Sequence, residues 1–309
     1  MRFEDDEQDT EKSVNTYNVL KDWGMQVLIG IVTSNPCISV ATETYNDNMF
    51  QITPSGSAVD CTANPNVFRV CFSDPNQGVV SADFIDSHKL ATKIGIIYDS
   101  SDVYSNDIYE KFVEESAGKS YEIVAEEPLT QDSKTDFTTQ LNKIKCTGAD
   151  LVFLPFYYSE AALVLNQAKQ IGYAPTFFGC DGMDGILTLE NFDSSLAEGL
   201  MLLTPFAADA TDSLTVNFVK TYKNKHGEVP NQFAADAYDC VYALKAAVES
   251  ANLTPADSVS AICNGLKSAM TKITLNGLTG GNISWNSNGE PNKSPKAVVI
   301  KNGAYVLAN

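Results

Sequence analysis

The sequence predicts an α/β protein built on parallel sheets, and the stretch Leu151–Gly185 gives the clearest reason. It opens with the apolar run LVFLPF, which is typical of a strand buried on both faces. A helix follows, with Ser159 as its expected N-cap and with apolar residues at helical spacing, Ala162, Leu165, Ala168 and Ile171. After Gly172 the run TFFG predicts a second buried strand. Two buried strands joined by a helix form a β-α-β unit, in which the strands are parallel.

Polar residues follow both strands of this unit. Tyr157 and Tyr158 come after the first strand, and Cys180-Asp181-Gly182 comes after the second. Ligands bind at the carboxyl edge of open α/β sheets, so tyrosine hydroxyls and one carboxylate are expected at the same rim. The alternative is that the tyrosines only cover the sheet edge and that Asp181 only caps a turn. Asp184, three residues on, is expected to face solvent or to cap the next helix.

Apolar strands and helices alternate in the same way through the first half of the chain. The expected strands are residues 2–5, VLIG, FQIT, VFRVCF and KIGIIYD. The expected helices are residues 10–23 with Thr10 as cap, a helix from the loop IVTSNP to about residue 48, a helix after SDPNQG, and a helix from the loop SSDVYSND to about residue 116.

The second half begins with β-α units and ends differently. The strand YEIVAEE and a helix over residues 136–145 precede the opening stretch. The strand GLMLLTPF and helices over about 213–226, 232–251 and 255–269 follow it. Residues 275–309 are rich in Gly, Asn and Pro with alternating apolar residues, which predicts hairpins with Asn302-Gly303 as a turn.

Length and charge narrow the class of protein. The 309 residues exceed one average domain, so two lobes or one large α/β domain are expected. The 39 acidic and 21 basic residues give a net charge of −18, which repels phosphate backbones, so nucleic acid is not an expected partner. No run reaches the ~18 apolar residues of a membrane-spanning helix.

The seven cysteines show neither CxxC nor Cys/His spacing, and the histidines are His88 and His226, so no metal site and no cofactor are expected. Cys61 and Cys71 flank a short loop and could form a disulfide if the protein is exported; otherwise both are free thiols. The first ten residues, MRFEDDEQDT, lack the basic region and apolar stretch of a signal peptide. Residues 1–5 have the pattern of a strand already under way.

A family resemblance rests on motifs in a fixed order along nearly the whole chain. They are ITPSGS, FRVCFSDPNQG, KIGIIYD followed by a tyrosine loop, FYYSEA, FFGCDGMDG, GLMLLTPF and FAADAYDCVYAL. In this order the sequence resembles the type I periplasmic solute-binding proteins of amino-acid ABC transporters, the leucine/isoleucine/valine-binding class.

The resemblance implies two doubly wound, Rossmann-like lobes joined by three crossover segments, with a ligand cleft between them. The N-terminal lobe would comprise residues 1–74 and 208–271, and the C-terminal lobe residues 75–207 and 272–309. The crossovers would lie near 73–76, 204–208 and 272–277. Members of the family begin with an apolar strand and a helix that have no counterpart here, so the first strand and helix of the N-terminal lobe are expected to be missing, which would leave a sheet edge unpaired.

The resemblance also implies the function. It suggests an extracytoplasmic binding protein, in the periplasm or as a cell-surface lipoprotein, without catalytic activity. It would capture a free apolar or branched-chain L-amino acid by hinge closure, as a monomer, and pass it to an ABC transporter permease. The alternative is a ligand-sensing domain of a receptor with the same fold, binding an amino acid or amide.

The family's ligand-binding positions match seven residues of this sequence. Ser34 in VTSNP matches the serine that binds the ligand carboxylate, and Ser55 and Ser57 in PSGS match the pair that adds backbone groups and a hydroxyl. Tyr157 and Asp181 match the tyrosine and the acid near the ligand ammonium, supported by Ser57. Tyr104 and Tyr238 match aromatic residues lining the cleft.

The chemistry of these residue types agrees with an amino-acid ligand. Hydroxyls and amides in strand-end loops suit a carboxylate, and Asp181 suits an ammonium. Phe156, Tyr158 and Tyr104 would then line an apolar side-chain subsite. A hydrolase is disfavoured because PSGSA lacks the GxSxG spacing. The segment GLTGGN does not follow a β-α turn pattern, which disfavours a dinucleotide site.

Overall fold

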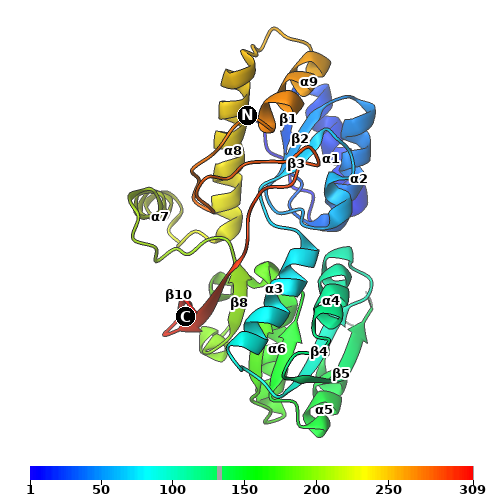
Figure 1. The fold of residues 1–309 in the computed structure, drawn as a ribbon, viewed down its shortest axis with the longest axis vertical. Helices are drawn as coiled ribbons and strands as arrows, with labels where there is room; N and C mark the ends of the chain where they lie inside the picture. The colour runs from blue at the N-terminus through cyan, green and yellow to red at the C-terminus, as the bar shows by residue number, and fades with distance from the viewer. Residues whose placement is uncertain (131–133, 309) are drawn as a thin grey trace. The chain divides into compact units, whose positions relative to one another are not determined.

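The computed structural model describes residues 1–130 and 134–308. It divides the chain into two compact units. Unit 1 comprises Met1–Ser73 and Phe233–Ser294, and unit 2 comprises Asp74–Gln232 and Pro295–Asn309. Each unit has its own sheet and its own helices, shown in Figure 1.

Unit 1 is built on a parallel sheet of three strands in the order β1-β2-β3. The strands are β1 (Val27–Ile29), β2 (Phe50–Thr53) and β3 (Val67–Arg69). The helices are α1 (Thr10–Asp22), α2 (Ser34–Asn46), α9 (Val259–Met270) and α8 (Gln232–Ala251), whose first residue belongs to unit 2. A short 3-10 helix, η1 (Val59–Thr62), precedes β3.

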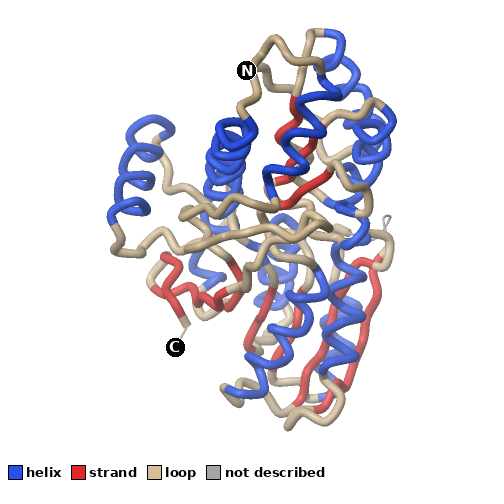
Figure 2. Tube along the Cα trace, turned by 45° about the horizontal axis from the view of Figure 1, so that its top comes forward, coloured by secondary structure: helices blue, strands red, loops and turns tan. Residues whose placement is uncertain are grey.

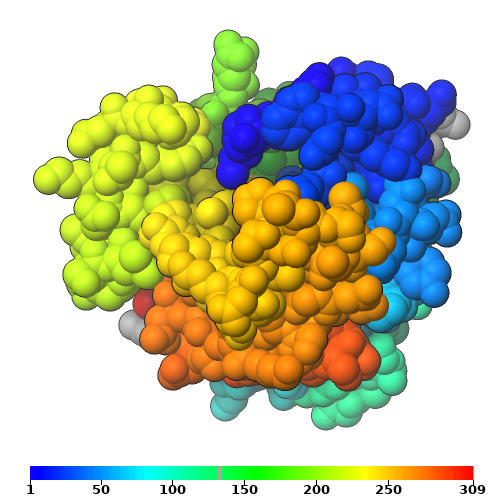
Figure 3. Space-filling view, turned by 90° about the horizontal axis from the view of Figure 1, so that it is seen from above, coloured from blue at the N-terminus to red at the C-terminus, as the bar shows by residue number. Residues whose placement is uncertain are grey.

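The two faces of this sheet carry different cores. On one face Leu28 of β1 packs with Tyr17 of α1 and Val40 of α2. On the other face a second core joins β2 and β3 to α8 and α9, with Phe50, Phe68, Ala243 and Leu266 among its members. In Figure 3 the orange surface of α9 lies beside the yellow surface of α8. Helices therefore cover both faces, as a doubly wound lobe requires.

Unit 2 contains a sheet of seven strands in the order β10-β9-β8-β7-β6-β4-β5. The parallel strands are β4 (Lys93–Asp99), β5 (Glu122–Leu129), β6 (Leu151–Leu154), β7 (Thr176–Gly179) and β8 (Met201–Thr204). The antiparallel strands are β9 (Lys296–Lys301) and β10 (Ala304–Leu307). They form the predicted hairpin, in which Asn302 and Gly303 have positive φ values of 53° and 72°.

Helices cover both faces of this sheet as well, as Figure 2 shows for the red strands between blue helices. On one face α3 (Asp74–Ser87) and α4 (Val103–Glu115) pack through Ile85 and Phe112. On the other face α5 (Thr138–Thr147) and α6 (Tyr158–Gln170) pack through Leu141 and Val164. The remaining elements are α7 (Ser213–His226) and the 3-10 helices η3 (Asp181–Met183), η4 (Ile186–Thr188) and η5 (Ser194–Ala197).

Two lobe boundaries differ from those that the resemblance implied. Residues 208–232 belong to unit 2, because the side chain of Gln232 bonds the carbonyl of Asp181 at 2.9 Å and the hydroxyl of Thr204 at 3.1 Å. Residues 272–294 belong to unit 1, because the indole N–H of Trp285 donates to the carbonyl of Arg69 at 2.7 Å. The first segment of unit 1 ends at Ser73.

The prediction of a strand over residues 2–5 is wrong. Residues 1–6 have no regular secondary structure, and the backbone N–H groups of Glu7 and Gln8 donate to the carboxylates of Asp5 and Asp6, which forms a turn at residues 7 and 8. In the described residues β1 pairs with β2 alone. Asp9 caps α1 in place of Thr10, and α6 begins at Tyr158, one residue before its expected cap Ser159.

Cys61 and Cys71 are both buried, and the structure does not join them by the suggested disulfide. Cys61 points elsewhere, because its Sγ lies 3.7 Å from the carbonyl oxygen of Ser34, and a hydrogen bond with Cys37 together with burial raises the pKa of its thiol. Within the described ranges, no helix combines the length and the apolar character that crossing a membrane demands.

Candidate functional site

In unit 2, three side chains predicted at the site come from the carboxyl ends of three adjacent strands. Tyr104 lies on α4 after β4, Tyr157 precedes α6 after β6, and Asp181 opens η3 after β7. Because β4, β6 and β7 are neighbours in the sheet, these residues meet. The hydroxyl of Tyr104 donates to Oδ1 of Asp181 at 2.8 Å, and the rings of Tyr104 and Tyr157 stack with centroids 4.9 Å apart.

The hydroxyl that reaches Asp181 is therefore that of Tyr104, which had been assigned to the apolar lining. Tyr157, matched to the tyrosine at the ammonium, contributes its ring to this contact. Phe156, also expected to line the ligand, is 2% exposed and packs in the core near Phe137, with ring centroids 6.2 Å apart. Tyr158 packs against the same core and is half-buried.

Burial dominates the electrostatics of this group. Asp181 is 2% exposed, and burial raises the pKa of its carboxyl, while hydrogen bonds led by the one from Tyr104 oppose the rise. Burial and the nearby Asp181 carboxylate raise the pKa of Tyr104 well above its ordinary value, so the phenol stays protonated and donates. A buried carboxylate with a neutral donor beside it is stabilised further by a cation.

Gly182 allows the tyrosines to approach the backbone. Its N–H donates to the hydroxyl of Tyr104 at 2.9 Å. A Cβ at this position would lie 2.8 Å from the Tyr104 hydroxyl oxygen and 3.0 Å from Cδ1 of Tyr157. Any larger residue would therefore push both rings away from Asp181.

Two glutamines that the sequence analysis missed hold the backbone of Asp181. The side-chain oxygen of Gln77 accepts the N–H of Asp181 at 3.1 Å, and the side-chain amide of Gln232 donates to its carbonyl at 2.9 Å. Both glutamines are fully buried. Gln77 lies in the first turn of α3 and Gln232 begins α8, and these positions do not reveal a partner about a hundred residues away in the case of Gln77.

Asp184 does not face solvent, since it is 4% exposed. Its Oδ2 accepts the backbone N–H of Gln232 at 2.7 Å, so it caps α8, not the helix that follows it in sequence. Burial raises the pKa of Asp184 to about 6.

In unit 1, the three predicted serines lie around one loop and one helix start. Ser34 is the first residue of α2, and its Oγ accepts the N–H of Ala58 at 3.1 Å. Ser55 and Ser57 belong to the loop between β2 and η1, and all three serines are buried. Oγ of Ser57 is buried without a hydrogen-bond partner, which is costly unless a ligand supplies one. The start of α2 carries positive dipole charge that suits an anion.

Arg69 shapes this loop and was not singled out from the sequence. It is fully buried, and its guanidinium donates to the carbonyl of Gly56 at 3.0 Å and also to the carbonyl of Ser57. It forms an ion pair of 2.7 Å with Glu290. The signal was a lone charge inside the apolar strand VFRVCF, because a buried arginine needs partners.

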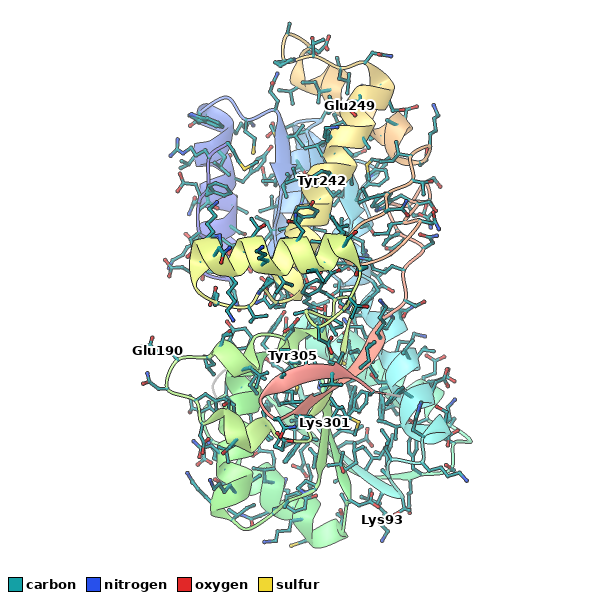
Figure 4. All side chains as sticks on the ribbon, turned by 90° about the vertical axis from the view of Figure 1, so that its left-hand side faces the viewer. Lys93, Glu190, Tyr242, Glu249, Lys301 and Tyr305 are labelled. Atoms are coloured by element: carbon teal, nitrogen blue, oxygen red, sulfur yellow. The ribbon has the colours of Figure 1, made fainter. Side chains whose placement is uncertain are left out.

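The seventh predicted residue, Tyr238, lies on α8 and packs against Tyr242, with ring centroids 4.5 Å apart. Figure 4 labels Tyr242 on this helix. It comes from a different element than the serine loop. No group of three or more His, Cys, Asp or Glu side chains arranged for a metal ion occurs in the part of the chain that the structure describes.

The chain folds into two doubly wound α/β units. Comparison of its sequence with known proteins identifies its family. The sequence matches the periplasmic binding protein family over residues 1–304, and the chain belongs to that family. It is 25% identical over 270 residues to the Leu/Ile/Val-binding protein homolog 3 of Brucella melitensis, covering 86% of this chain and 71% of that protein.

Two further comparisons agree. The chain is 27% identical to the leucine-, isoleucine-, valine-, threonine- and alanine-binding protein of Pseudomonas aeruginosa, over 83% of this chain and 68% of that protein. Its fold is similar to that of the branched-chain amino acid transporter substrate-binding protein LivJ of Streptococcus pneumoniae, solved in complex with isoleucine. The TM-score is 0.86 at 23% identity, covering 99% of this chain and 86% of that one.

Proposed function

We propose that this chain is the extracytoplasmic solute-binding component of an ABC importer. It captures a free apolar or branched-chain L-amino acid and delivers it to a membrane permease, without chemical turnover. The ligand names of the relatives support this class of solute. The periplasm or the outer face of the cell membrane is the compartment in which such a protein meets its substrate.

The observation that carries the proposal is the buried pair of Asp181 and Tyr104. The ammonium group of an amino acid is a cation, and it would neutralise the negative charge of the buried carboxylate. Gln77 and Gln232 fix the backbone at this position, so the carboxylate does not have to be reordered when the ligand binds.

The second pole is the serine loop of unit 1. The unpartnered hydroxyl of Ser57, the hydroxyl of Ser34 and the positive start of α2 are groups suited to a carboxylate. Hinge closure is the step that would bring this pole and Asp181 to the two ends of one ligand. About four charge-assisted hydrogen bonds of roughly 1.5–3 kcal/mol each would be consistent with micromolar binding after the entropic cost of association.

A thermal-shift screen of the common amino acids tests the ligand class. Leucine, isoleucine or valine at about a thousand times Kd should stabilise the folded chain by about 4 kcal/mol, which is a clear rise in Tm. Glutamate and lysine are the controls, because their charged side chains do not suit an apolar subsite. A clear response to a sugar or a dicarboxylate, with none to leucine, isoleucine, valine or phenylalanine, would overturn the proposal.

A further inference from the structure

Two buried cysteines of unit 1 lie next to each other beside the serine loop. Cys37 is on α2, one turn after Ser34, and Cys61 is on η1, just after the loop. Both side chains are 0% exposed. A hydrogen bond joins the two thiols, and it is the largest influence that raises the pKa of the Cys61 thiol. Cys61 was expected to pair with Cys71, but its sulfur neighbour in the structure is Cys37.

The two sulfur atoms contact three parts of the carboxylate pole. A Cβ at Gly56 would lie 2.8 Å from Sγ of Cys37, so the backbone of the serine loop packs directly on this sulfur. Sγ of Cys61 lies 3.7 Å from the carbonyl oxygen of Ser34 at the start of α2. The side-chain amide of Gln51 on β2 donates to Sγ of Cys37 at 3.5 Å. The pair therefore lies where α2, the serine loop and β2 meet.

We propose that Cys37 and Cys61 form a disulfide when the chain folds in an oxidising medium, and that this bond clamps the start of α2 to η1 across the serine loop. Each thiol gives up one proton and one electron, and the two electrons reduce a small-molecule disulfide, here oxidised glutathione, to two thiols. One protein thiolate displaces the first glutathione, and the other protein sulfur displaces the second. The contact of the Cys61 S–H with the carbonyl of Ser34 is lost with its proton.

Burial determines when this reaction takes place. The thiolate is the reactive form of a cysteine, and burial and Cys37 raise the pKa of the Cys61 thiol well above its ordinary value. Neither sulfur is exposed to an oxidant in the folded unit. The disulfide therefore forms while the chain is folding, before α2 and η1 pack together, and it does not depend on which solute the protein binds.

Peptide mapping identifies the pairing. The chain is refolded from urea in a glutathione redox buffer, alkylated, digested and analysed by mass spectrometry without reduction. No Lys or Arg interrupts residues 22–68, so trypsin leaves Cys37 and Cys61 on one peptide, and a glutamate-specific protease then separates them by cleavage after Glu43. The expected product is these two halves joined by one disulfide. Alkylation of both cysteines, or a link from Cys61 to the peptide that carries Cys71, would overturn the proposal.

Melting temperatures test the clamp. We expect the chain refolded with oxidant to melt about 5–10 °C above the chain refolded with reductant, because the closed loop restricts the unfolded state. Cys37→Ala and Cys61→Ala should each abolish this redox difference, whatever their own stability. Cys71→Ala is the matched control, since Cys71 is also buried, and should retain the difference. No difference in the unmodified chain, or a difference that persists in Cys37→Ala, would overturn the inference.

Discussion

The hydroxyl of Tyr104 donates to Oδ1 of Asp181 at 2.8 Å and accepts the N–H of Gly182 at 2.9 Å. The phenol of Tyr104 thus holds both the carboxylate of the candidate ammonium subsite and the backbone beside it in place. The pairing joins residues 77 positions apart and depends on β4, β6 and β7 being adjacent.

Removing the hydroxyl of Tyr104 should weaken ligand binding without abolishing it. Tyr104→Phe keeps the ring against Tyr157 but leaves Oδ1 of Asp181 and the N–H of Gly182 without this partner. We expect a loss of roughly 1–3 kcal/mol in leucine affinity, measured by calorimetry. Tyr109→Phe is the control on the same helix, because its hydroxyl bonds Glu126 instead. Equal affinities of the two variants would contradict the role given to Tyr104.

Arg69 should act on the ligand through the serine loop. Arg69→Met leaves the carbonyls of Gly56 and Ser57 without their donor, so we expect a stability loss of about 2–4 kcal/mol and weaker leucine binding in the protein that remains folded. Urea denaturation and calorimetry measure the two effects. Glu290→Gln keeps the arginine and should reduce both the stability and the leucine affinity less than Arg69→Met does. A destabilised Arg69→Met protein with unchanged affinity would show that the loop does not bind the ligand.

The pH dependence of stability should reveal Asp184. Burial raises its pKa, with a smaller rise from Asp181, while the N–H of Gln232 and the hydroxyl of Tyr305 oppose this. The folded chain therefore holds a proton that the unfolded chain has lost between pH 3.8 and about 6, and unfolding free energy falls as pH rises through that window. This interval corresponds to about 3 kcal/mol.

Asp184→Asn cannot titrate, so its stability relative to the unmodified chain should rise by about 3 kcal/mol between pH 4 and pH 8 in urea denaturation. Asp193→Asn is a control of opposite sign. Hydrogen bonds from Ser195 lower the pKa of Asp193, so its contribution to stability is present above its unfolded pKa and is lost as pH falls. A pH-independent difference for Asp184→Asn would mean that Asp184 is not desolvated.

Local patterns predicted the elements well and the contacts between them poorly. The β-α-β unit from Leu151, the strand Lys93–Asp99 and the Asn302-Gly303 hairpin are confirmed, because apolar runs, caps and turn residues act over a few positions. The strand at residues 2–5 and the bridge between Cys61 and Cys71 are wrong, because each needed a partner that local sequence does not specify.

For the candidate site, too, local motifs indicated residues but not the contacts between them. Motif matching proposed Asp181, Tyr104 and the serines as site residues, but it did not indicate which hydroxyl reaches Asp181. Gln77, Gln232 and Arg69 hold the site in place through contacts that depend on strand order and burial. The pairing of Asp184 with the start of α8, 48 positions away, could not be read from the turn that contains it.

We expect Asp181 to be the negative charge that binds the ligand ammonium. Asp181→Asn keeps the shape and one acceptor but removes the charge from a fully buried position. We expect the leucine affinity to fall by roughly 2–4 kcal/mol, or about thirty- to a thousandfold. Calorimetric titration of leucine into Asp181→Asn, with Asp193→Asn as an exposed control, is the direct measurement. Wild-type affinity in Asp193→Asn with this loss in Asp181→Asn is the predicted result, whereas wild-type affinity in both would remove Asp181 from the site.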